Sequence, residues 1–383
     1  MKRRDFLKMT LLGTASLAAG IDVARAAELA SGAASFPPVP VYRTLGRTGL
    51  KVALVSFGAM LTPEPEVIRA GFDMGINYVD TARVYMNGRN EEIVGKALKG
   101  CRDKVIVATK TKGKSVTPEA IIEDVETSLA QLQTDHIDII QLHNVTNGNR
   151  DRLFDRNVRA ALAGLRKEGK IRFVGVTTHT DQADILNAVV DDPDRFFDTV
   201  LVGYNFKSPP ELKAAIARAA AAGVGIVAMK TQIGGYQVPA GDTTTPHQAA
   251  LKWVLADTNV ATAIPGMKDM AMLKEDLSVM GMKLTAADLN RLERYSRAVD
   301  GIYCRLCARC EATCPNHVSI SVVNRSLMYA EGYRNMELAR ATYRDLEPAA
   351  SARACGNCSG CVARCAHGLD IAAKMSAARA LLA

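Results

Sequence analysis

The sequence predicts an α/β fold, a (β/α)8 TIM barrel, followed by a small, all-helical, cysteine-rich domain. Between residues 42 and 280, short apolar runs alternate with longer segments of helical spacing. Eight such repeats suit the closure of a parallel sheet into a barrel. Eight of the nine cysteines lie in the last 80 residues, beyond the alternating region.

Length and composition exclude several classes of protein. With 383 residues, of which 48% are hydrophobic, the chain can form one large core and a small one, so it is neither disordered nor fibrous. The formal net charge of +8 falls to +5 without the first 26 residues, and the remaining charges form no basic run. Nucleic acid is therefore not an expected partner.

The first 26 residues are expected to be an export signal. Arg3-Arg4 and Phe6-Leu7-Lys8 precede a modest apolar stretch and a small-x-small cleavage site, Ala24-Arg25-Ala26. This resembles a twin-arginine signal, which implies export of the folded protein to the periplasm; a frayed basic tail is the alternative. The apolar stretch is too short to span a bilayer, so no membrane span is expected in the mature protein. A Pro-rich linker, residues 27–41, follows.

The barrel is expected over residues 42–298. Its eight strands are expected at Val52–Phe57, Ile76–Val79, Val105–Thr109, Ile137–Leu142, Ile171–Val176, Thr199–Val202, Val224–Ala228 and Ala261–Ile264. Residues 118–131 illustrate the helical spacing, with Thr117 as N-cap and a stripe of Ile121, Ile122, Val125, Leu129 and Leu132. A doubly wound sheet is the alternative, disfavoured because no G-x-G-x-x-G motif follows the first strand.

Four polar residues follow the ends of neighbouring strands, on the rim where barrel enzymes carry their chemistry. They are Asp80, Tyr85, Lys110 and His143. The pKa of a tyrosine hydroxyl is ordinarily near ~10, and the ammonium of Lys110 would favour its ionised form. Asp80 can hold Lys110, and His143 can orient a carbonyl. Together they predict proton transfer during carbonyl reduction or alcohol oxidation, with a small polar carbonyl or alcohol as substrate.

Further motifs between about Val41 and Leu277 have the same spacing as those of a known family. Tyr42–Leu50, Gly75-Ile76-Asn77, Asp80-Thr81-Ala82 and Glu91–Leu98 resemble segments of the aldo/keto reductases. The resemblance implies a hairpin at residues 42–50 that closes the barrel bottom. It also implies that the four rim residues are a catalytic tetrad with Tyr85 as acid and base, and that NADP(H) lies extended across the barrel mouth.

The same resemblance implies a set of cofactor-binding residues, some of which depart from the family's pattern. They are Thr177, Thr178, Met229, Lys230, Pro265, Gly266, Met267, Lys268 and Asp276. Thr177-Thr178 replaces the usual Ser-Asn, Met229 replaces an aromatic residue, and Asp276 replaces Asn. A thioether can still pack on the nicotinamide, and Lys230 can pair with a phosphate. NADP and NAD both remain open.

Two cysteine runs lie in the last part of the chain, expected to be a separate domain over residues 299–383. Both have the spacing C-x2-C-x2-C-x3-C, at Cys304, Cys307, Cys310 and Cys314, and at Cys355, Cys358, Cys361 and Cys365. This is the spacing of ferredoxins with two [4Fe–4S] clusters, and the chain resembles a branch of the reductases with such a domain. In such modules Cys365 joins the first three cysteines of the first run, and Cys314 joins the first three of the second.

Zinc and disulfides are the alternative explanations of these cysteines. Zinc would not need a third cysteine at this spacing and would leave the count of eight unexplained. Disulfides suit an exported protein. A protein that acquires clusters in the cytoplasm, however, needs an export route for folded cargo, which the twin-arginine signal supplies. Helical spacing over residues 319–346, with Val322, Leu327, Met328, Met336 and Leu338 as candidate buried positions, favours an α-helical ferredoxin-like module.

Two functions are compatible with this sequence. The first is a periplasmic oxidoreductase whose barrel interconverts a carbonyl and an alcohol and whose clusters exchange electrons with an external carrier. The second is an electron-transfer or assembly protein with a degenerate, non-catalytic barrel. The coupling between hydride and single-electron transfer is open, because a direct link normally requires a flavin and no flavin site is recognisable.

Overall fold

The computed structural model describes residues 36–113, 116–236 and 244–383. Residues 39–383 form one compact unit, and residues 1–38 form another, of which only residues 36–38 are described. The proposed signal and most of the proposed linker therefore lie outside the described residues. Within the described part, no helix has the length and apolar character needed to cross a membrane.

The described residues contain an eight-stranded parallel sheet whose strands neighbour one another in chain order. The strands are β3 (Phe57–Gly58), β4 (Tyr78–Asp80), β5 (Ile106–Lys110), β6 (Ile137–Leu142), β7 (Ile171–Thr178), β8 (Thr199–Gly203), β9 (Gly225–Met229) and β10 (Thr262–Ala263). Parallel bridges from Val55 to Ala263 and from Gly58 to Gly266 connect the first strand to the last. The sheet is thus a closed barrel, which confirms the predicted (β/α)8 part of the fold class.

One predicted strand, Val52–Phe57, is wrong, because the chain divides this run between two sheets. Its first part belongs to β2 (Lys51–Ala53), which pairs antiparallel with β1 (Tyr42–Thr44), and its last residue begins β3. The side chain of Asn77 forms two hydrogen bonds with the backbone of β2. It accepts from the N–H of Ala53 at 2.9 Å and donates to the carbonyl of Lys51 at 2.7 Å. The β1–β2 hairpin lies at the amino-terminal end of β9, where Leu45 packs against Gly225.

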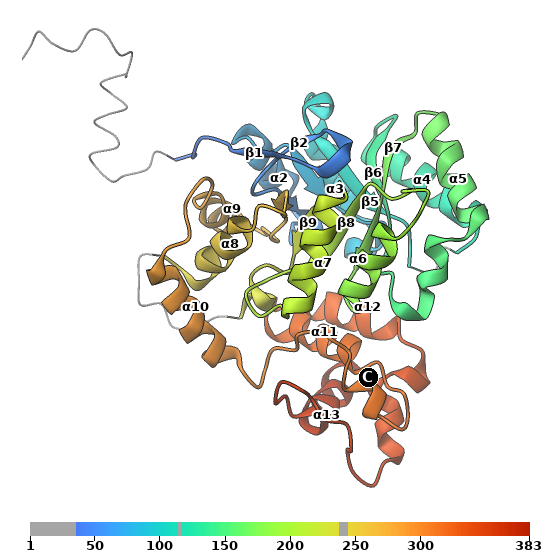
Figure 1. Ribbon diagram of the computed structural model, residues 1–383, viewed down its shortest axis with the longest axis vertical. Coiled ribbons are helices and arrows are strands. Elements are labelled where there is room, and N and C mark those ends of the chain that lie inside the picture. Colours follow the sequence, from blue (N-terminus) through green and yellow to red (C-terminus); the bar gives the residue numbers. More distant parts are fainter. Residues whose placement is uncertain (1–35, 114–115, 237–243) are drawn as a thin grey trace, which may run out of the picture. The chain divides into compact units, whose positions relative to one another are not determined.

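Helices connect the strands and surround them (Figure 1). They are α2 (Pro65–Asp73), α3 (Asn90–Leu98), α4 (Pro118–Leu132), α5 (Arg156–Lys167), α6 (Gln182–Val190), α7 (Pro210–Ala221), α8 (Pro246–Ala256), α9 (Met270–Leu277) and α10 (Ala286–Val299). In α4 the hydroxyl of Thr117 accepts the N–H of Ala120, as its position predicts. The predicted stripe is buried except for Ile122, which is 40% exposed because it points away from the barrel.

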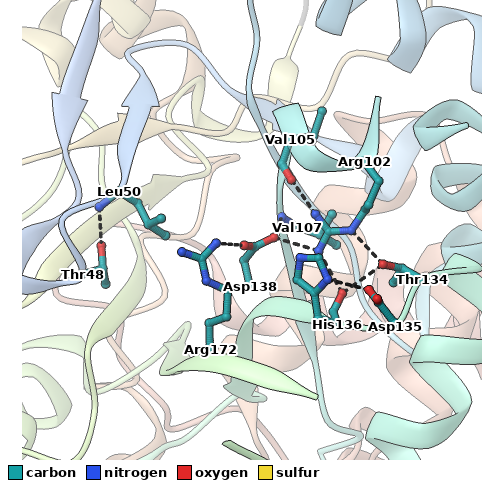
Figure 2. Close-up of polar contacts among 10 residues, drawn as sticks. All are labelled: Thr48, Leu50, Arg102, Val105, Val107, Thr134, Asp135, His136, Asp138 and Arg172. Carbon is teal, nitrogen blue, oxygen red and sulfur yellow. Dashed lines mark hydrogen bonds and ion pairs between the residues drawn. The ribbon is translucent and has the colours of Figure 1, made fainter. Parts of the chain in front are cut away.

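The amino-terminal ends of three strands are joined by the buried carboxylate of Asp138 (Figure 2). It accepts from Arg102 at 2.9 Å, from Arg172 at 2.6 Å and from the backbone N–H of Val107 at 2.9 Å. These contacts link β5, β6 and β7 at the end of the barrel opposite the predicted site. At that end of a barrel, polar networks serve stability and not catalysis.

The cysteine-rich region contains helices and turns, and its described residues form no strand. Its helices are α11 (Ile320–Glu331), α12 (Met336–Arg344) and α13 (Ile371–Leu382), drawn in orange and red in Figure 1. The continuous helical segment expected over residues 319–346 is interrupted, because α11 ends at Glu331, with Gly332 as its C-cap, and Asn335 caps α12 through the N–H of Leu338. Of its candidate buried positions, Leu327 and Met328 are buried, whereas Val322, Met336 and Leu338 are only partly buried. Gly332 is also a point of close packing, since a Cβ there would lie 2.1 Å from the carbonyl oxygen of Gly234 in the loop after β9.

Candidate active site

A cavity of about 1280 Å³ lies at the carboxyl-terminal ends of the strands. The barrel contributes Asp80, Tyr85 and His143 to its lining, and α11 of the cysteine-rich region contributes Arg325 and Tyr329. Sites for drug-sized ligands have volumes of roughly 300–1,000 Å³. This cavity is therefore large enough for a long ligand together with a small one.

The ammonium of Lys110 is held by two neighbours on β4 and the turn after it. Its Nζ donates to Oδ1 of Asp80 at 2.5 Å and to the carbonyl of Thr81 at 2.6 Å. The second oxygen of Asp80 accepts from Nε2 of Gln141 at 2.9 Å. Burial lowers the pKa of Lys110, but Asp80 and Tyr85 raise it by more in total, so Lys110 remains charged.

Tyr85 begins the short 3-10 turn Tyr85–Gly88 and lies beside this ion pair. The Nζ of Lys110 is 4.6 Å from the centroid of its ring, and the His143 ring meets it edge to face at 6.4 Å between centroids. Burial raises the pKa of Tyr85, and Lys110 opposes that effect without overcoming it. The phenol is therefore protonated at neutral pH, which is the form that donates a proton to a carbonyl oxygen.

His143 follows β6 and is neutral at neutral pH. Burial lowers its pKa well below the ordinary value, and the positive charges of Lys110, Arg325 and Arg152 lower it further. A neutral imidazole can hydrogen-bond a substrate oxygen without competing with Tyr85 as the proton donor. The four predicted rim residues thus meet at one wall of the cavity, with Lys110 directly behind it.

Buried polar contacts hold this wall in place. The carboxylate of Glu91, fully buried on α3, accepts from the hydroxyl of Thr109 at 2.6 Å and from Arg83 at 2.9 Å. Thr109 directly precedes Lys110 in β5, so its contact fixes the end of that strand. Asn90, also on α3, accepts from the hydroxyl of Thr81 at 2.7 Å and donates to the carbonyl of Ala59.

Comparison with known proteins relates this arrangement of rim residues to a protein family. The model of the aldo/keto reductase family matches residues 64–237, which include all four rim residues. The matched segment is therefore similar to the aldo/keto reductases. An L-galactose dehydrogenase of Arabidopsis thaliana is 36% identical over 152 residues, covering 35% of this chain and 47% of that protein. An aldo-keto reductase of Bacillus subtilis is 38% identical over 171 residues, covering 39% of this chain and 50% of that protein.

The alignments cover part of each sequence, whereas the structural likeness covers nearly all of a solved chain. The chain spans about half the length of these two curated relatives. An aldo/keto reductase of Klebsiella pneumoniae, solved in complex with NADP and acetate, has the same fold with a TM-score of 0.56 and 23% identity. That likeness covers 67% of this chain and 95% of the Klebsiella chain.

The residues expected to bind the cofactor fall into two groups. Five line the cavity of the barrel: Met229, Lys230, Pro265, Gly266 and Lys268. The buried Met229 and Lys230 end β9, and the other three follow β10. An apolar thioether and cations along one cavity are suitable contacts for a nicotinamide ring and for phosphates, so this part of the site fits the family's cofactor.

The other four residues lie outside the cavity lining. The hydroxyl of Thr177 accepts the N–H of Asn144 at 2.8 Å, and that of Thr178 donates to the carbonyl of Thr180 at 2.6 Å. Met267 is fully buried. Asp276 is also buried and accepts from Gln232 at 2.5 Å; burial raises the pKa of its carboxyl well above the ordinary value. These residues support the loops beside the cavity.

The eight terminal cysteines are free thiols in two groups. Burial raises the pKa of Cys304, and the charges of Cys310, Cys307 and Cys365 raise it further, so these four sulfurs are neighbours. Cys355 has the same relation to Cys358, Cys314 and Cys361. No described group of three or more ligand side chains is arranged around a single metal ion.

The loops around the first group direct backbone N–H groups at two of its sulfurs. The backbone N–H of Leu306 approaches Sγ of Cys304 at 3.4 Å, and that of His367 approaches Sγ of Cys365 at 3.3 Å. Leu306 and Ala308 both have φ near +58°, which lets the loop curl around its cysteines. N–H groups directed at sulfur are typical of iron–sulfur sites, so the residues present fit a cluster.

Two residues of α11 at the cavity are absent from the sequence-based prediction. Arg325 and Tyr329 line the cavity, and the Tyr329 hydroxyl accepts from Nζ of Lys230 at 3.0 Å. The signal for them was a polar stripe at spacing four, Ser321, Arg325 and Tyr329, on a segment that is otherwise largely apolar. That spacing indicates a shared helix face, but it does not say which part of the barrel the face meets.

Proposed function

We propose that this chain is an NADP(H)-dependent oxidoreductase that interconverts a carbonyl and an alcohol, with Tyr85 as proton donor and acceptor. The observation that carries the proposal is the buried Lys110–Asp80 ion pair, which lies against the Tyr85 ring at the wall of the cavity. A bound nicotinamide would supply or accept the hydride. The aldo-keto reductase relatives and the Klebsiella fold support this reading.

The residues of this chain have distinct roles in the proposed reaction. During reduction, Tyr85 donates its phenolic proton to the developing alkoxide, and the adjacent Lys110 stabilises the phenolate that remains. Asp80 keeps Lys110 in position and charged. The neutral His143 hydrogen-bonds the substrate oxygen. During oxidation the proton moves in the opposite direction, from the alcohol to the Tyr85 phenolate.

The cofactor is proposed to occupy the part of the cavity lined by Met229, Lys230 and Lys268. Met229 would pack against the nicotinamide, and the two lysines would pair with phosphates. A direct test is titration of the purified protein with NADPH and with NADH, followed by assay with a probe aldehyde such as 4-nitrobenzaldehyde. Micromolar binding of NADPH with turnover supports the proposal, and no binding of either nucleotide contradicts it.

We infer further that the cysteine-rich region holds two [4Fe–4S] clusters. One would be held by Cys304, Cys307, Cys310 and Cys365, and the other by Cys314, Cys355, Cys358 and Cys361. The repeated spacing, the two groups of neighbouring thiols and the N–H groups directed at sulfur support this inference. Bound clusters would exchange single electrons with an external carrier.

The twin-arginine motif supports a periplasmic location for the mature protein. Arg3 and Arg4 belong to a segment outside the described residues. Replacing both by lysine is expected to leave the protein in the cytoplasm, as followed by fractionation of cells that carry the native chain or the variant. Equal export of the two proteins would contradict the proposed location.

A further inference from the structure

Arg325, on α11, is a buried cation that forms no ion pair with any other residue that the structure describes. Its side chain lines the cavity although the residue is only 9% exposed. Its Nε is buried and has no hydrogen-bond partner among the described residues. Burial of an unpaired charge is costly, so such groups are usually found where a ligand supplies the opposite charge.

The acidic residues that line the described cavity do not serve as that countercharge. Asp80 is paired with Lys110, and Glu275 lies near His247 and accepts from the hydroxyl of Thr245. Asp269 caps α9 by accepting the N–H of Met272 at 2.9 Å. The last one, Asp345, is an exposed residue beyond the end of α12.

A second cation adds to the positive charge at this wall. Lys230 is also 9% exposed, and its Nζ donates a hydrogen bond to the hydroxyl of Tyr329 at 3.0 Å. Burial lowers the pKa of Lys230, and the nearby charge of Arg325 lowers it further. Burial alone would raise the pKa of Tyr329, but Lys230 and Arg325 together reverse that effect.

Arg325 lies on the side of the cavity where the carbonyl is expected. Its charge lowers the pKa of both His143 and His179, which both line the cavity. The His143 ring also meets that of Tyr85 edge to face. A ligand bound to His143 and Tyr85 would therefore present its neighbouring substituents to Arg325.

We propose that the substrate is an anionic carbonyl compound, an oxo acid or its hydroxy acid, whose carboxylate is bound by Arg325 of α11. This inference rests on the proposed function, and it makes the cysteine-rich region a part of the substrate site. The planar guanidinium can hold a carboxylate through two parallel hydrogen bonds. Lys230 provides additional positive charge at the same wall.

Two matched aldehydes separate recognition of the carboxylate from catalysis. 4-Carboxybenzaldehyde and its methyl ester differ in charge and share the reacting group. Replacing Arg325→Met is expected to lower kcat/KM for the acid by about 10- to 150-fold, mainly through KM, because a charge-assisted hydrogen bond is lost. The ester should change by less than about threefold. Arg325→Lys should restore part of the preference, and Arg340→Met, an exposed change on α12, should leave it unaltered.

Binding of benzoate to the NADP-loaded protein, measured by calorimetry, gives a readout that is independent of turnover. Tyr85→Phe should retain benzoate binding and Arg325→Met should lose it, even if the barrel proves not to reduce carbonyls. The proposal is overturned if benzoate binding does not depend on Arg325, or if acid and ester are affected equally. It is also overturned if Arg325→Met weakens NADPH binding alone, since Arg325 would then hold a cofactor phosphate.

Discussion

At Tyr85, burial and neighbouring charge shift the pKa in opposite directions. Lys110 favours the phenolate, as the sequence predicts, but burial raises the pKa by more. At neutral pH the site therefore holds a protonated phenol beside the charged ammonium of Lys110. This arrangement favours proton donation, because the positive charge of Lys110 stabilises the phenolate that donation leaves behind more than it stabilises the neutral phenol.

The first prediction concerns the dependence of the rate on pH. The raised pKa of Tyr85 keeps the donor protonated from neutral to mildly alkaline pH, so kcat for reduction should stay constant there. Oxidation needs the phenolate and should increase with pH over the same range. His143, with its lowered pKa, should add no step near its ordinary pKa of ~6.5. Pre-steady-state rates in both directions would check this, and a drop in reduction above pH 8 would contradict it.

Among the site residues, the four rim side chains were predictable because each follows the end of a strand in a recognisable repeat. Arg325 and Tyr329 were not predictable, since nothing local in α11 says that this helix faces the barrel mouth. Their position depends on packing between segments far apart in the sequence, such as Gly332 against Gly234.

At the scale of elements, some helices and strands follow from the local sequence pattern, whereas the limits of others depend on tertiary contacts. The α4 helix follows from its cap, its first-turn proline and its spacing. The run Val52–Phe57 has no break in composition, and only the contacts of Asn77 with β2 show where the hairpin ends. Likewise, the interruption between α11 and α12 depends on a glycine packed against another loop.

A second prediction concerns the polar network at the amino-terminal end of the barrel. Asp138→Ala leaves Arg102 without its buried partner and removes the acceptor of the Val107 N–H. The free energy of unfolding should fall by about 3–5 kcal/mol. Asp135→Ala is the matched control, because the Asp135 side chain is 93% exposed and solvent screens its contact with His136. Denaturant unfolding would compare the two, and equal losses would contradict the role of Asp138.

At the scale of the whole molecule, the cysteine-rich region and the barrel form one compact unit with a shared cavity. The cysteine spacing predicts what this region carries, whereas the structure adds that its α11 helix lines the proposed catalytic site. The region is therefore proposed to have two roles, one in electron transfer and one in substrate recognition.

A third prediction tests the two cluster sites separately. Anaerobically purified protein should contain about eight iron atoms per chain. Cys304→Ser should lose about four of them and keep the second cluster, and Cys358→Ser should do the reverse. Cys101→Ser, a change in the barrel, should lose none. Iron analysis with absorption spectra would measure this, and iron content that is insensitive to Cys304 would argue against the assignment.

The central claim, that Tyr85 transfers the proton during carbonyl reduction, is tested most directly by Tyr85→Phe in the cluster-loaded, full-length protein. NADPH oxidation with a probe aldehyde should fall by roughly 10²- to 10⁴-fold, the contribution of a positioned acid. The dissociation constant for NADPH should stay unchanged, because the hydroxyl is proposed to contact only the substrate. A variant that reduces the aldehyde at the native rate would contradict the account and favour a non-catalytic barrel.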